Sequence, residues 1–452
     1  MPARLIFLLL AAGAAAQPPK LDIVALERAA TEEMAAAGVP GAAIGLVSGG
    51  KLVWSKGLGV SSVESGAPVT PDMLFRLGST TKMFTAAAVV SLALEDKLRL
   101  GDPAGKHIHG LPPRLAGLTP HQLLTHTAGL RDEAPMHGSH DEESLGRGIR
   151  AWDESWLFTA PGKIYSYSNP GYWMAGYLAE VVAGKPYADV LAERVFQPAG
   201  MSRTTLRPLV AITYPMAQGH NADGGGSPVV VRPAADNTAT WPAGSIFSSV
   251  SDLARFVSAL MNGGRIDDKP ALPADLVTQL MTPRVEDRRL NVRYGYGLSI
   301  DEDRGARLVG HGGSRMGYGS LIRMAPEHRA AVIVVANRTG ASLARTAGLA
   351  LRMLVPMPPE TKPEPQAGMP IAESDFPKFT AVYANGPSRI EIVAEGGKLM
   401  VSRLGGKAPL VWHGGDRYSI GSSEGPQNAV FVPAADGRIE YIFRGGRALA
   451  RQ

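Results

Sequence analysis

Apolar and polar positions follow two different periods at the start of the chain. In residues 22–38, DIVALERAATEEMAAAG, apolar side chains recur every three or four positions, which predicts a helix that ends at Gly38. Residues 41–60 contain two apolar runs around Gly49-Gly50, a pattern typical of a β-hairpin. The first elements are therefore predicted to be one helix and one hairpin.

The same kinds of element return in reverse order near residue 320. Residues 318–339, YGSLIRMAPEHRAAVIVVANRT, predict two strands around a Pro-Glu-His turn, and residues 341–354 predict a helix. This order favours one antiparallel sheet to which both ends of the domain contribute, with a mostly helical insertion between them. The predicted fold class is α+β: an antiparallel sheet flanked by helices, an α/β sandwich, with a helical subdomain.

The last part of the chain has a different composition. Residues 356–372 are rich in proline and predict a linker after a first domain at residues 20–355. Residues 373–452 then show short apolar runs separated by turns, as in NAVFVPAADGRIEYIFRGGRALAR. Such spacing predicts a small all-β domain, with a barrel as the expected form. A chain of 452 residues also fits two domains better than one.

The first residues predict export. Arg4 precedes a short apolar run, and Ala14 to Ala16 match the A-x-A pattern of a cleavable signal peptide, which is expected over residues 1–16. No later segment approaches the ~20 apolar residues that a spanning helix needs. The mature protein is therefore expected to be secreted across the inner membrane, periplasmic or extracellular, and to have no integral membrane segment.

Composition limits the remaining classes. The formal charge is +5, but the Lys and Arg residues are scattered, so we expect no nucleic-acid partner. The chain has no cysteine, which excludes disulfides, thiol catalysis and a lipoprotein anchor. Its histidines, among them His107 and His109, form no metal-ligand pattern, and no metal or other cofactor is expected.

Ser79 and Lys82 are the first chemical candidates. They precede the run MFTAAAVVSLAL, which is apolar on nearly every side and therefore predicts a helix through the core. The spacing Ser-x-x-Lys would place both side chains on one helical face, about 5–6 Å apart at Cβ. Burial lowers the pKa of a lysine, so an unprotonated amine could take the serine proton. The alternative is a serine cap followed by an ordinary lysine.

Two further patterns follow along the chain. Tyr167 and Asn169 form Tyr-x-Asn just before a predicted helix, which could hold a phenol and an amide in a cleft. His311, Gly312 and Gly313 lead into the predicted strands, and two glycines at a strand edge allow another backbone to approach closely. The alternatives are an Asn-Pro-Gly turn and a tyrosine packed with its hydroxyl outward.

Each pattern has a second copy. Ser48 and Lys51 repeat Ser-x-x-Lys on the hairpin turn, and in the C-terminal domain Tyr383 and His413 begin a second Tyr-x-Asn and a second His-Gly-Gly. We interpret all three copies as turns. One set alone occurs in the order Ser-x-x-Lys, Tyr-x-Asn, His-Gly-Gly within one domain, and this conjunction favours a catalytic site.

The three ordered motifs, together with LTPHQLLTHTAGL, WPAGSIFSSVSDLARFVSALMNGG and YGYGLSI, resemble the serine β-lactamase and penicillin-binding-protein superfamily. The nearest branch is similar to the class C β-lactamases and their esterase, D-aminopeptidase and D-alanyl-D-alanine carboxypeptidase relatives. The resemblance covers residues 25–355 and implies a β-lactamase/transpeptidase-like fold. The C-terminal domain resembles the lipocalin-type β domain appended to some of these enzymes.

The resemblance implies a role for each motif. Ser79 would attack a carbonyl carbon to give an acyl-enzyme, with Lys82 as the base. Tyr167 would carry the proton to the leaving group and later help to activate water, while Asn169 would bind Lys82 and the substrate amide. The backbone N–H groups of Ser79 and Ser314 would form the oxyanion hole.

The third motif departs from the usual Lys-Thr-Gly of β-lactamases. His311 is largely neutral at pH 7 and supplies little fixed positive charge for a substrate carboxylate, although Gly312 and Gly313 would still line the substrate. Histidine also occurs at this position in some D-Ala carboxypeptidases, D-aminopeptidases and esterases of the superfamily, so the resemblance implies esters or D-amino-acid peptides as the favoured substrates. Two alternatives stay open: hydrolysis of β-lactam antibiotics, and a non-catalytic relative that binds peptidoglycan or a protein. The partner of the C-terminal domain is not indicated, and His126 is expected to brace its loop.

Overall fold

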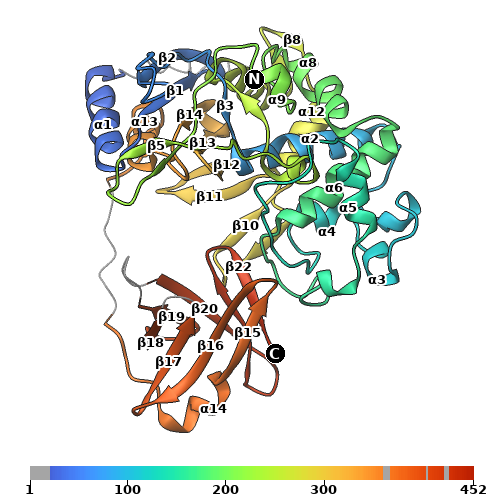
Figure 1. The fold of residues 1–452 in the computed structure, drawn as a ribbon, viewed down its shortest axis with the longest axis vertical. Helices are drawn as coiled ribbons and strands as arrows, with labels where there is room; N and C mark the ends of the chain where they lie inside the picture. Colours follow the sequence, from blue (N-terminus) through green and yellow to red (C-terminus); the bar gives the residue numbers. More distant parts are fainter. Residues whose placement is uncertain (1–20, 360–366, 404–405, 422–426) are drawn as a thin grey trace, which may run out of the picture.

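A computed structural model describes residues 21–359, 367–403, 406–421 and 427–452 (Figure 1). The predicted signal peptide, residues 1–16, lies outside the described residues, as does the middle of the predicted linker. Figure 1 shows a larger part of helices and sheet with a smaller β part below it.

An eight-stranded antiparallel sheet forms the centre of the larger part, as predicted. The first segment of the chain in this sheet pairs with the last one, because Ala42 of the first strand, β1, lies opposite Ala336 of the last strand, β14. The sheet is wider than the sequence indicated, since the chain adds further strands at residues 285–315 before it returns to the centre. In sheet order the strands are β2 (Lys51–Gly59), β1 (Gly41–Ser48), β14 (Ala330–Ala336), β13 (Tyr318–Ala325), β12 (Ala306–Arg315), β11 (Ser299–Asp303), β10 (Val292–Tyr294) and β9 (Val285–Asp287).

Helices cover both faces of this sheet. On β1, Ile44 and Leu46 belong to one apolar cluster, which also contains residues of the neighbouring helices α1 and α13, while Ala43 and Val47 belong to the cluster of the helical insertion. Alternate side chains of a strand point to opposite faces, so this sheet is buried on both sides. The α-helices of the larger part are α1 (Ile23–Ala36), α2 (Thr81–Leu94), α3 (Pro113–Ala116), α4 (Pro120–Leu124), α5 (Ser144–Arg150), α6 (Asn169–Ala183), α7 (Tyr187–Leu191), α8 (Gln197–Ala199), α9 (Pro208–Ala211), α10 (Trp241–Gly244), α11 (Val250–Met261), α12 (Ala274–Met281) and α13 (Ala344–Leu354), whereas α14 (Phe376–Phe379) packs in the C-terminal part.

Three pairs of short strands lie outside the main sheet: β3 (Phe75–Arg76) with β6 (Phe247–Ser248), β4 (His220–Ala222) with β5 (Pro228–Val230), and β7 (Arg265–Ile266) with β8 (Lys269–Pro270). No helix among the described residues is both long enough and apolar enough to cross a bilayer.

The C-terminal part is a closed eight-stranded barrel, as the sequence predicted. The interpretation of Tyr383 as part of a turn is wrong, because Tyr383 lies buried inside strand β15 and only the following Gly386 adopts a positive φ of 57°. The strands are β15 (Ala381–Asn385), β16 (Ser388–Glu395), β17 (Lys398–Arg403), β18 (Gly406–Trp412), β19 (Arg417–Ile420), β20 (Gln427–Pro433), β21 (Ile439–Arg444) and β22 (Arg447–Arg451).

The barrel packs against the larger part through apolar and polar contacts. The rings of Tyr165 and Phe443 meet edge to face with their centroids 6.3 Å apart, inside an apolar cluster to which both parts contribute. At the rim of this cluster the hydroxyls of Thr159 and Tyr441 lie 2.6 Å apart. The tip of the β21–β22 hairpin is held as well, because Tyr167 donates its backbone N–H to the carbonyl of Gly446 (2.9 Å). This contact places the barrel beside the Tyr-x-Asn motif.

Candidate active site

Ser79 lies in a 3-10 turn, Gly78–Thr80, directly before α2. The turn packs backbone to backbone on strand β12. A Cβ atom on Gly78 would lie 2.6 Å from the nitrogen of Ser314, and one on Gly313 would lie 1.9 Å from the carbonyl oxygen of Leu77. Glycine is therefore required at both positions, because any side chain would push the turn away from the strand.

The His-Gly-Gly motif lies on β12. Gly312 and Gly313 pair with Leu321 and Ser320 of β13, whereas the pairing of β12 with β11 ends at Gly310. Among the described strands, none pairs with the other side of these glycines, which therefore lie at a strand edge, as the sequence predicted. The prediction of a close backbone approach is confirmed at Gly313 only. A Cβ on Gly312 would make only ordinary van der Waals contacts, with Leu321 Cδ1 and the carbonyl oxygen of Ser320 each 3.8 Å away.

Lys82 is fully buried on the first turn of α2 and has three polar neighbours. Its Nζ lies 2.7 Å from Asn169 Oδ1, 2.8 Å from the carbonyl oxygen of Ala243 and 3.2 Å from Ser79 Oγ. A neutral amine has two N–H groups and one lone pair. The amide and carbonyl oxygens can only accept, so the lone pair is left to accept the hydroxyl proton of Ser79.

The protonation of Lys82 is set mainly by burial. Removal from water lowers the pKa of Lys82 well below its ordinary value; the carboxylate of Asp132 acts against this, and the guanidinium of Arg447 adds to it. The arrangement therefore supplies what the sequence argument required, an amine with a depressed pKa within reach of a serine hydroxyl.

Tyr167 is also close to Ser79. Burial raises the pKa of Tyr167 above its ordinary value, while a hydrogen bond with Ser79 acts in the opposite direction. Its ring also faces Lys82, with Nζ 4.7 Å from the ring centroid. The phenol consequently keeps its proton and can act as a donor beside Ser79.

Asn169 is held by an aspartate that the sequence reasoning missed. Its backbone N–H and its Nδ2 both donate to Asp132 Oδ1, at 2.8 and 3.0 Å. The other carboxylate oxygen of Asp132 accepts from Arg447 Nε (2.5 Å). These contacts orient the Asn169 amide so that Oδ1 faces Lys82.

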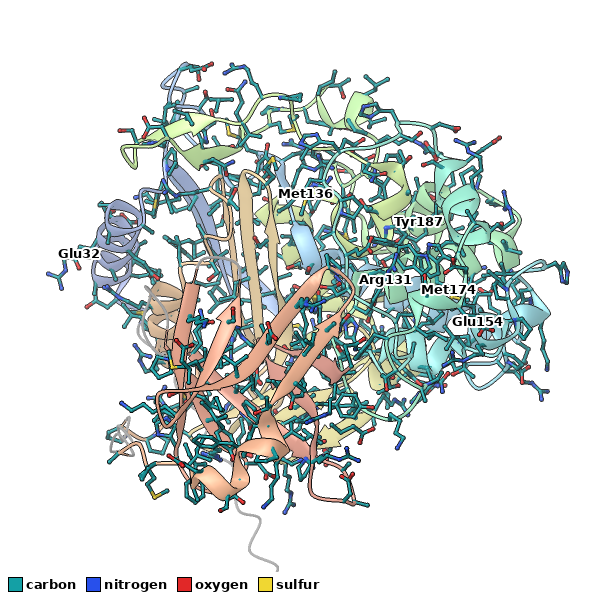
Figure 2. All side chains as sticks on the ribbon, turned by 60° about the horizontal axis from the view of Figure 1, so that its bottom comes forward. Glu32, Arg131, Met136, Glu154, Met174 and Tyr187 are labelled. Atoms are coloured by element: carbon teal, nitrogen blue, oxygen red, sulfur yellow. The ribbon has the colours of Figure 1, made fainter. Side chains whose placement is uncertain are left out.

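Asp132 and Arg447 gave no local signal in the sequence. Asp132 follows the family-like segment THTAGL without a motif of its own, and Arg447 belongs to another part of the fold. The barrel also contacts the backbone of Asp132, because the Asp132 N–H donates to Asn385 Oδ1 of the barrel (3.0 Å). Figure 2, with the barrel turned toward the viewer, labels the neighbouring Arg131 at this border.

Two histidines, His126 and His311, lie beside the ring of Tyr167, with ring centroids 4.3 and 6.1 Å from it. His126 accepts the N–H of Ser168 at Nδ1 (3.1 Å), so its proton is on Nε2, which faces the Tyr294 hydroxyl (3.3 Å). His311 has Nδ1 2.5 Å from the carbonyl oxygen of Gly312 and Nε2 3.2 Å from the same Tyr294 hydroxyl. Burial, and next to it the nearby Lys82, lowers the pKa of His311 to about 3. His311 is thus neutral, and His126 braces the loop before α6.

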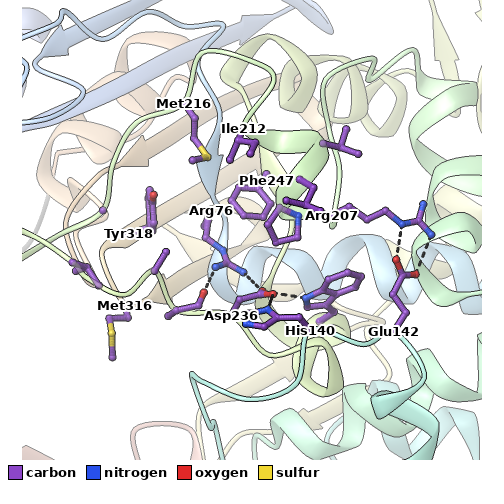
Figure 3. Close-up of a pocket in the computed structure, with 18 residues that line it drawn as sticks. Arg76, His140, Glu142, Arg207, Ile212, Met216, Asp236, Phe247, Met316 and Tyr318 are labelled. Carbon is purple, nitrogen blue, oxygen red and sulfur yellow. Dashed lines mark hydrogen bonds and ion pairs between the residues drawn. The ribbon is translucent and has the colours of Figure 1, made fainter.

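A cavity of about 200 Å³ opens at Ser79. Asn169, Ser314, Arg315 and Arg447 also line it, whereas His311, Gly312 and Gly313 do not. A larger cavity, about 510 Å³, has other lining residues, and Ser79 is not among them (Figure 3).

The buried ion pair between Arg76 and Asp236 (2.9 Å) lines this larger cavity, and Arg315 lies 3.9 Å from the same carboxylate, so these three side chains contribute to the wall between the two cavities. No group of three or more His, Asp or Glu side chains in the described residues is placed to hold a metal ion.

The second copies of the motifs lie elsewhere. Ser48 and Lys51 face each other across the β1–β2 hairpin, and His413 lies at the β18–β19 turn, where its N–H donates to Arg417. Tyr383 donates its hydroxyl to the carbonyl of Phe379 (2.7 Å) inside the barrel. The structure therefore brings together Ser79, Lys82, Tyr167 and Asn169, with Ser314 at the cavity wall.

Comparison with known proteins extends these observations. Protein flp of Staphylococcus aureus (strain MW2) is 26% identical over 305 residues, 66% of this chain and 60% of flp. The unguisins hydrolase ungD of Aspergillus violaceofuscus (strain CBS 115571) is 29% identical over 334 residues, 67% of this chain and 59% of ungD. The chain thus spans about three fifths of the length of these two relatives.

Solved structures resemble the fold over different lengths. The crystal structure of SurE matches with a TM-score of 0.77 and 24% identity over 95% of this chain and 98% of SurE. The D-alanine carboxypeptidase AmpC of Burkholderia cenocepacia matches with a TM-score of 0.60 and 25% identity over 74% of this chain and 100% of its own. The family model described as Beta-lactamase matches residues 26–354, and the chain therefore belongs to the β-lactamase family of serine hydrolases.

Proposed function

We propose that this protein is an exported hydrolase that cleaves an amide or ester bond of a small substrate through an acyl-enzyme on Ser79. The observation that carries the proposal is the environment of the buried Lys82 amine. Two oxygen atoms accept hydrogen bonds from its N–H groups, and its third polar neighbour is the hydroxyl of Ser79. A protein that only binds peptidoglycan or a partner has no chemical need for a buried lysine beside that serine, because burying the amine costs free energy.

The chemistry would proceed in two steps. Lys82 takes the hydroxyl proton while Ser79 Oγ attacks the carbonyl carbon, and the N–H groups of Ser79 and Ser314 receive the resulting oxyanion. The bond to the leaving group breaks, Tyr167 gives its proton to the departing oxygen or nitrogen, and Lys82 passes the serine proton on to Tyr167, so that the amine is neutral again. In the second step a water molecule gives one proton to the same base, its oxygen attacks the acyl carbon, and Ser79 recovers its proton.

Esters and peptides that contain D-amino acids are the favoured substrates. In the β-lactamases that carry Lys-Thr-Gly, the lysine offers a positive charge at the position of His311, whereas the buried His311 stays neutral because its pKa is lowered to about 3. The names of two similar proteins, a D-alanine carboxypeptidase and an unguisins hydrolase, agree with a hydrolase, and the first agrees with a substrate that contains a D-amino acid.

Covalent labelling tests this proposal. The purified mature protein would be exposed to a fluorophosphonate and, separately, to a penicillin, and its intact mass measured beside that of Ser79→Ala. A fluorophosphonate adduct on the unaltered protein alone supports Ser79 as the nucleophile. Equal labelling of Ser79→Ala, or no labelling with either compound, contradicts it. A stable penicillin adduct would indicate that β-lactams are recognised as well.

Export and the domain boundaries are also part of the proposal. We propose cleavage after residue 16, a hydrolase domain at residues 20–355 and a C-terminal domain at residues 373–452 joined by residues 356–372. Intact mass of the protein recovered outside the cytoplasm should correspond to a chain that begins at Gln17. A full-length protein confined to the cytoplasm would contradict the export proposal.

A further inference from the structure

A second pocket opens beside the catalytic cavity, at the border with the barrel. It has a volume of about 460 Å³ and shares Arg447 with the cavity at Ser79. Asp132 lines it from the larger part, whereas Arg389, Arg444 and Arg447 line it from the barrel. The pocket is therefore a direct neighbour of the catalytic residues.

Arg389 and Arg447 carry the positive charge on which the subsite depends. Asp132 lines the pocket too, but it already accepts from Asn169 and from Arg447 Nε. Within the described part of the chain, Arg389 is exposed and has no carboxylate within 4.0 Å, and Arg447 Nη2 has no hydrogen-bond partner. Guanidinium groups in such a setting attract carboxylates, which they bind with two parallel hydrogen bonds.

The hairpin that carries two of these arginines also contacts the catalytic loop. Arg444 and Arg447 pair across the β21–β22 turn, whose Gly446 carbonyl accepts the backbone N–H of Tyr167 (2.9 Å). The Arg447 guanidinium lies 4.9 Å from the centre of the Tyr167 ring. A ligand held by Arg447 would therefore lie within reach of the reacting groups around Ser79.

We propose that this pocket, formed by Arg389, Arg444 and Arg447 next to Asp132, is a subsite for a carboxylate group of the substrate. The proposal rests on the proposed hydrolase function and deepens it. The positive charge that is missing at His311 is provided instead by arginines of the barrel. Carboxylate-bearing peptides and esters are then better substrates than neutral ones of the same length.

Two p-nitrophenyl esters of matched length test the subsite: the hexanoate, which is neutral, and the monoester of glutaric acid, which carries a carboxylate at the end of its acyl chain. For the unaltered protein we expect a higher kcat/KM with the glutarate monoester. Arg389→Gln should lower the glutarate-to-hexanoate ratio of kcat/KM by about tenfold, because a charge-assisted hydrogen bond is lost. Arg417→Gln, an exposed position of β19 outside the pocket, should leave the ratio unchanged.

The design separates two failures. If Ser79→Ala abolishes hydrolysis of the hexanoate ester, the proposed function is supported, whatever the ratio of kcat/KM between the two esters. The subsite is overturned if the unaltered protein does not prefer the glutarate monoester, or if Arg389→Gln leaves the ratio unchanged. If neither ester is turned over, the proposed function fails. In that case, calorimetric titration of Ser79→Ala with the intact glutarate monoester tests the subsite. The subsite requires that the monoester binds to Ser79→Ala and that it binds about tenfold more weakly to Ser79→Ala/Arg389→Gln.

Discussion

Arg447 Nε donates a hydrogen bond to Asp132 Oδ2 (2.5 Å) across 315 positions of sequence. The other oxygen of Asp132 holds both nitrogen atoms of Asn169, whose Oδ1 contacts Lys82 Nζ (2.7 Å). An unbroken series of polar contacts thus runs from the barrel to the catalytic amine. The barrel is consequently part of the electrostatic environment of the candidate active site.

Arg447→Gln should shift the pH dependence of hydrolysis. The Arg447 charge lowers the pKa of Lys82, so its removal raises that pKa, and a larger fraction of the amine is protonated at neutral pH. We expect the acidic limb of the kcat/KM profile to move to higher pH, and kcat at pH 7 to fall by about tenfold. Arg447→Lys should restore much of the profile, whereas Arg438→Gln, an exposed barrel position, should not move it. An unchanged limb in Arg447→Gln would contradict the coupling.

Lys82→Arg should remove activity although it keeps a cation at the position. A guanidinium does not lose its proton in proteins, so it cannot accept the proton of Ser79. We expect a loss of about 10²- to 10⁴-fold in kcat/KM and little fluorophosphonate labelling. Lys51→Arg, in the second Ser-x-x-Lys on the hairpin turn, is the matched control and should label normally. Normal labelling of Lys82→Arg would mean that Lys82 is not the base.

Tyr167→Phe and Tyr383→Phe compare the two Tyr-x-Asn motifs. The first removes the hydroxyl beside Ser79 and should lower kcat by about 100-fold. The second removes a buried hydrogen bond to the Phe379 carbonyl, so it should lower the free energy of unfolding by about 1 kcal/mol and leave kcat unchanged. Equal kinetic effects of the two changes would show that the hydroxyl of Tyr167 has no special role.

The sheet ends and the order of the catalytic motifs could be predicted because their signals are local. The helix period of residues 22–38 and the hairpin around Gly49-Gly50 each lie within one short window. The same holds for the three spacings that include Ser79, Tyr167 and His311. Each spacing alone is ambiguous, and the structure separates the copies that lie together around Ser79 from the others by burial and by position in the fold.

The contribution of the barrel could not be predicted because it depends on how two parts of the chain pack. Arg447 is one of many arginines in the sequence, and only docking of the β21–β22 hairpin brings it to Asp132. The turn assignment of Tyr383 failed for a related reason: Tyr-Ala-Asn is compatible with a turn locally, but pairing with β16 and β22 extends it into a strand.

Alanine substitutions at the two glycines of the His-Gly-Gly motif should have different effects on the free energy of unfolding. A built Cβ on Gly313 would lie 1.9 Å from the Leu77 carbonyl oxygen, whereas one on Gly312 would meet nothing within 3.8 Å. Gly313→Ala should therefore lower the free energy of unfolding by roughly 2 kcal/mol or more and displace the turn that carries Ser79. Gly312→Ala should change it by no more than about 0.5 kcal/mol. Equal unfolding midpoints in urea would show that the turn and the strand separate at little cost.

The buried neutral His311 should make stability depend on pH below neutrality. Its folded-state pKa is about 3, below the ordinary value of 6.5, so between these values the unfolded chain binds more protons than the folded protein. Stability contributed by the neutral imidazole is complete above the unfolded pKa and decreases as the pH falls toward 3, by up to about 1.36 kcal/mol per pH unit.

Burial lowers the pKa of His126 as well, so both residues contribute in the same direction. His311→Gln should flatten the dependence of the urea unfolding free energy on pH between about 6.5 and 4, while His328→Gln on an exposed turn should not. An unaltered slope in His311→Gln would mean that His311 takes up a proton in the folded protein within this range, and that β12 does carry a positive charge at mildly acidic pH.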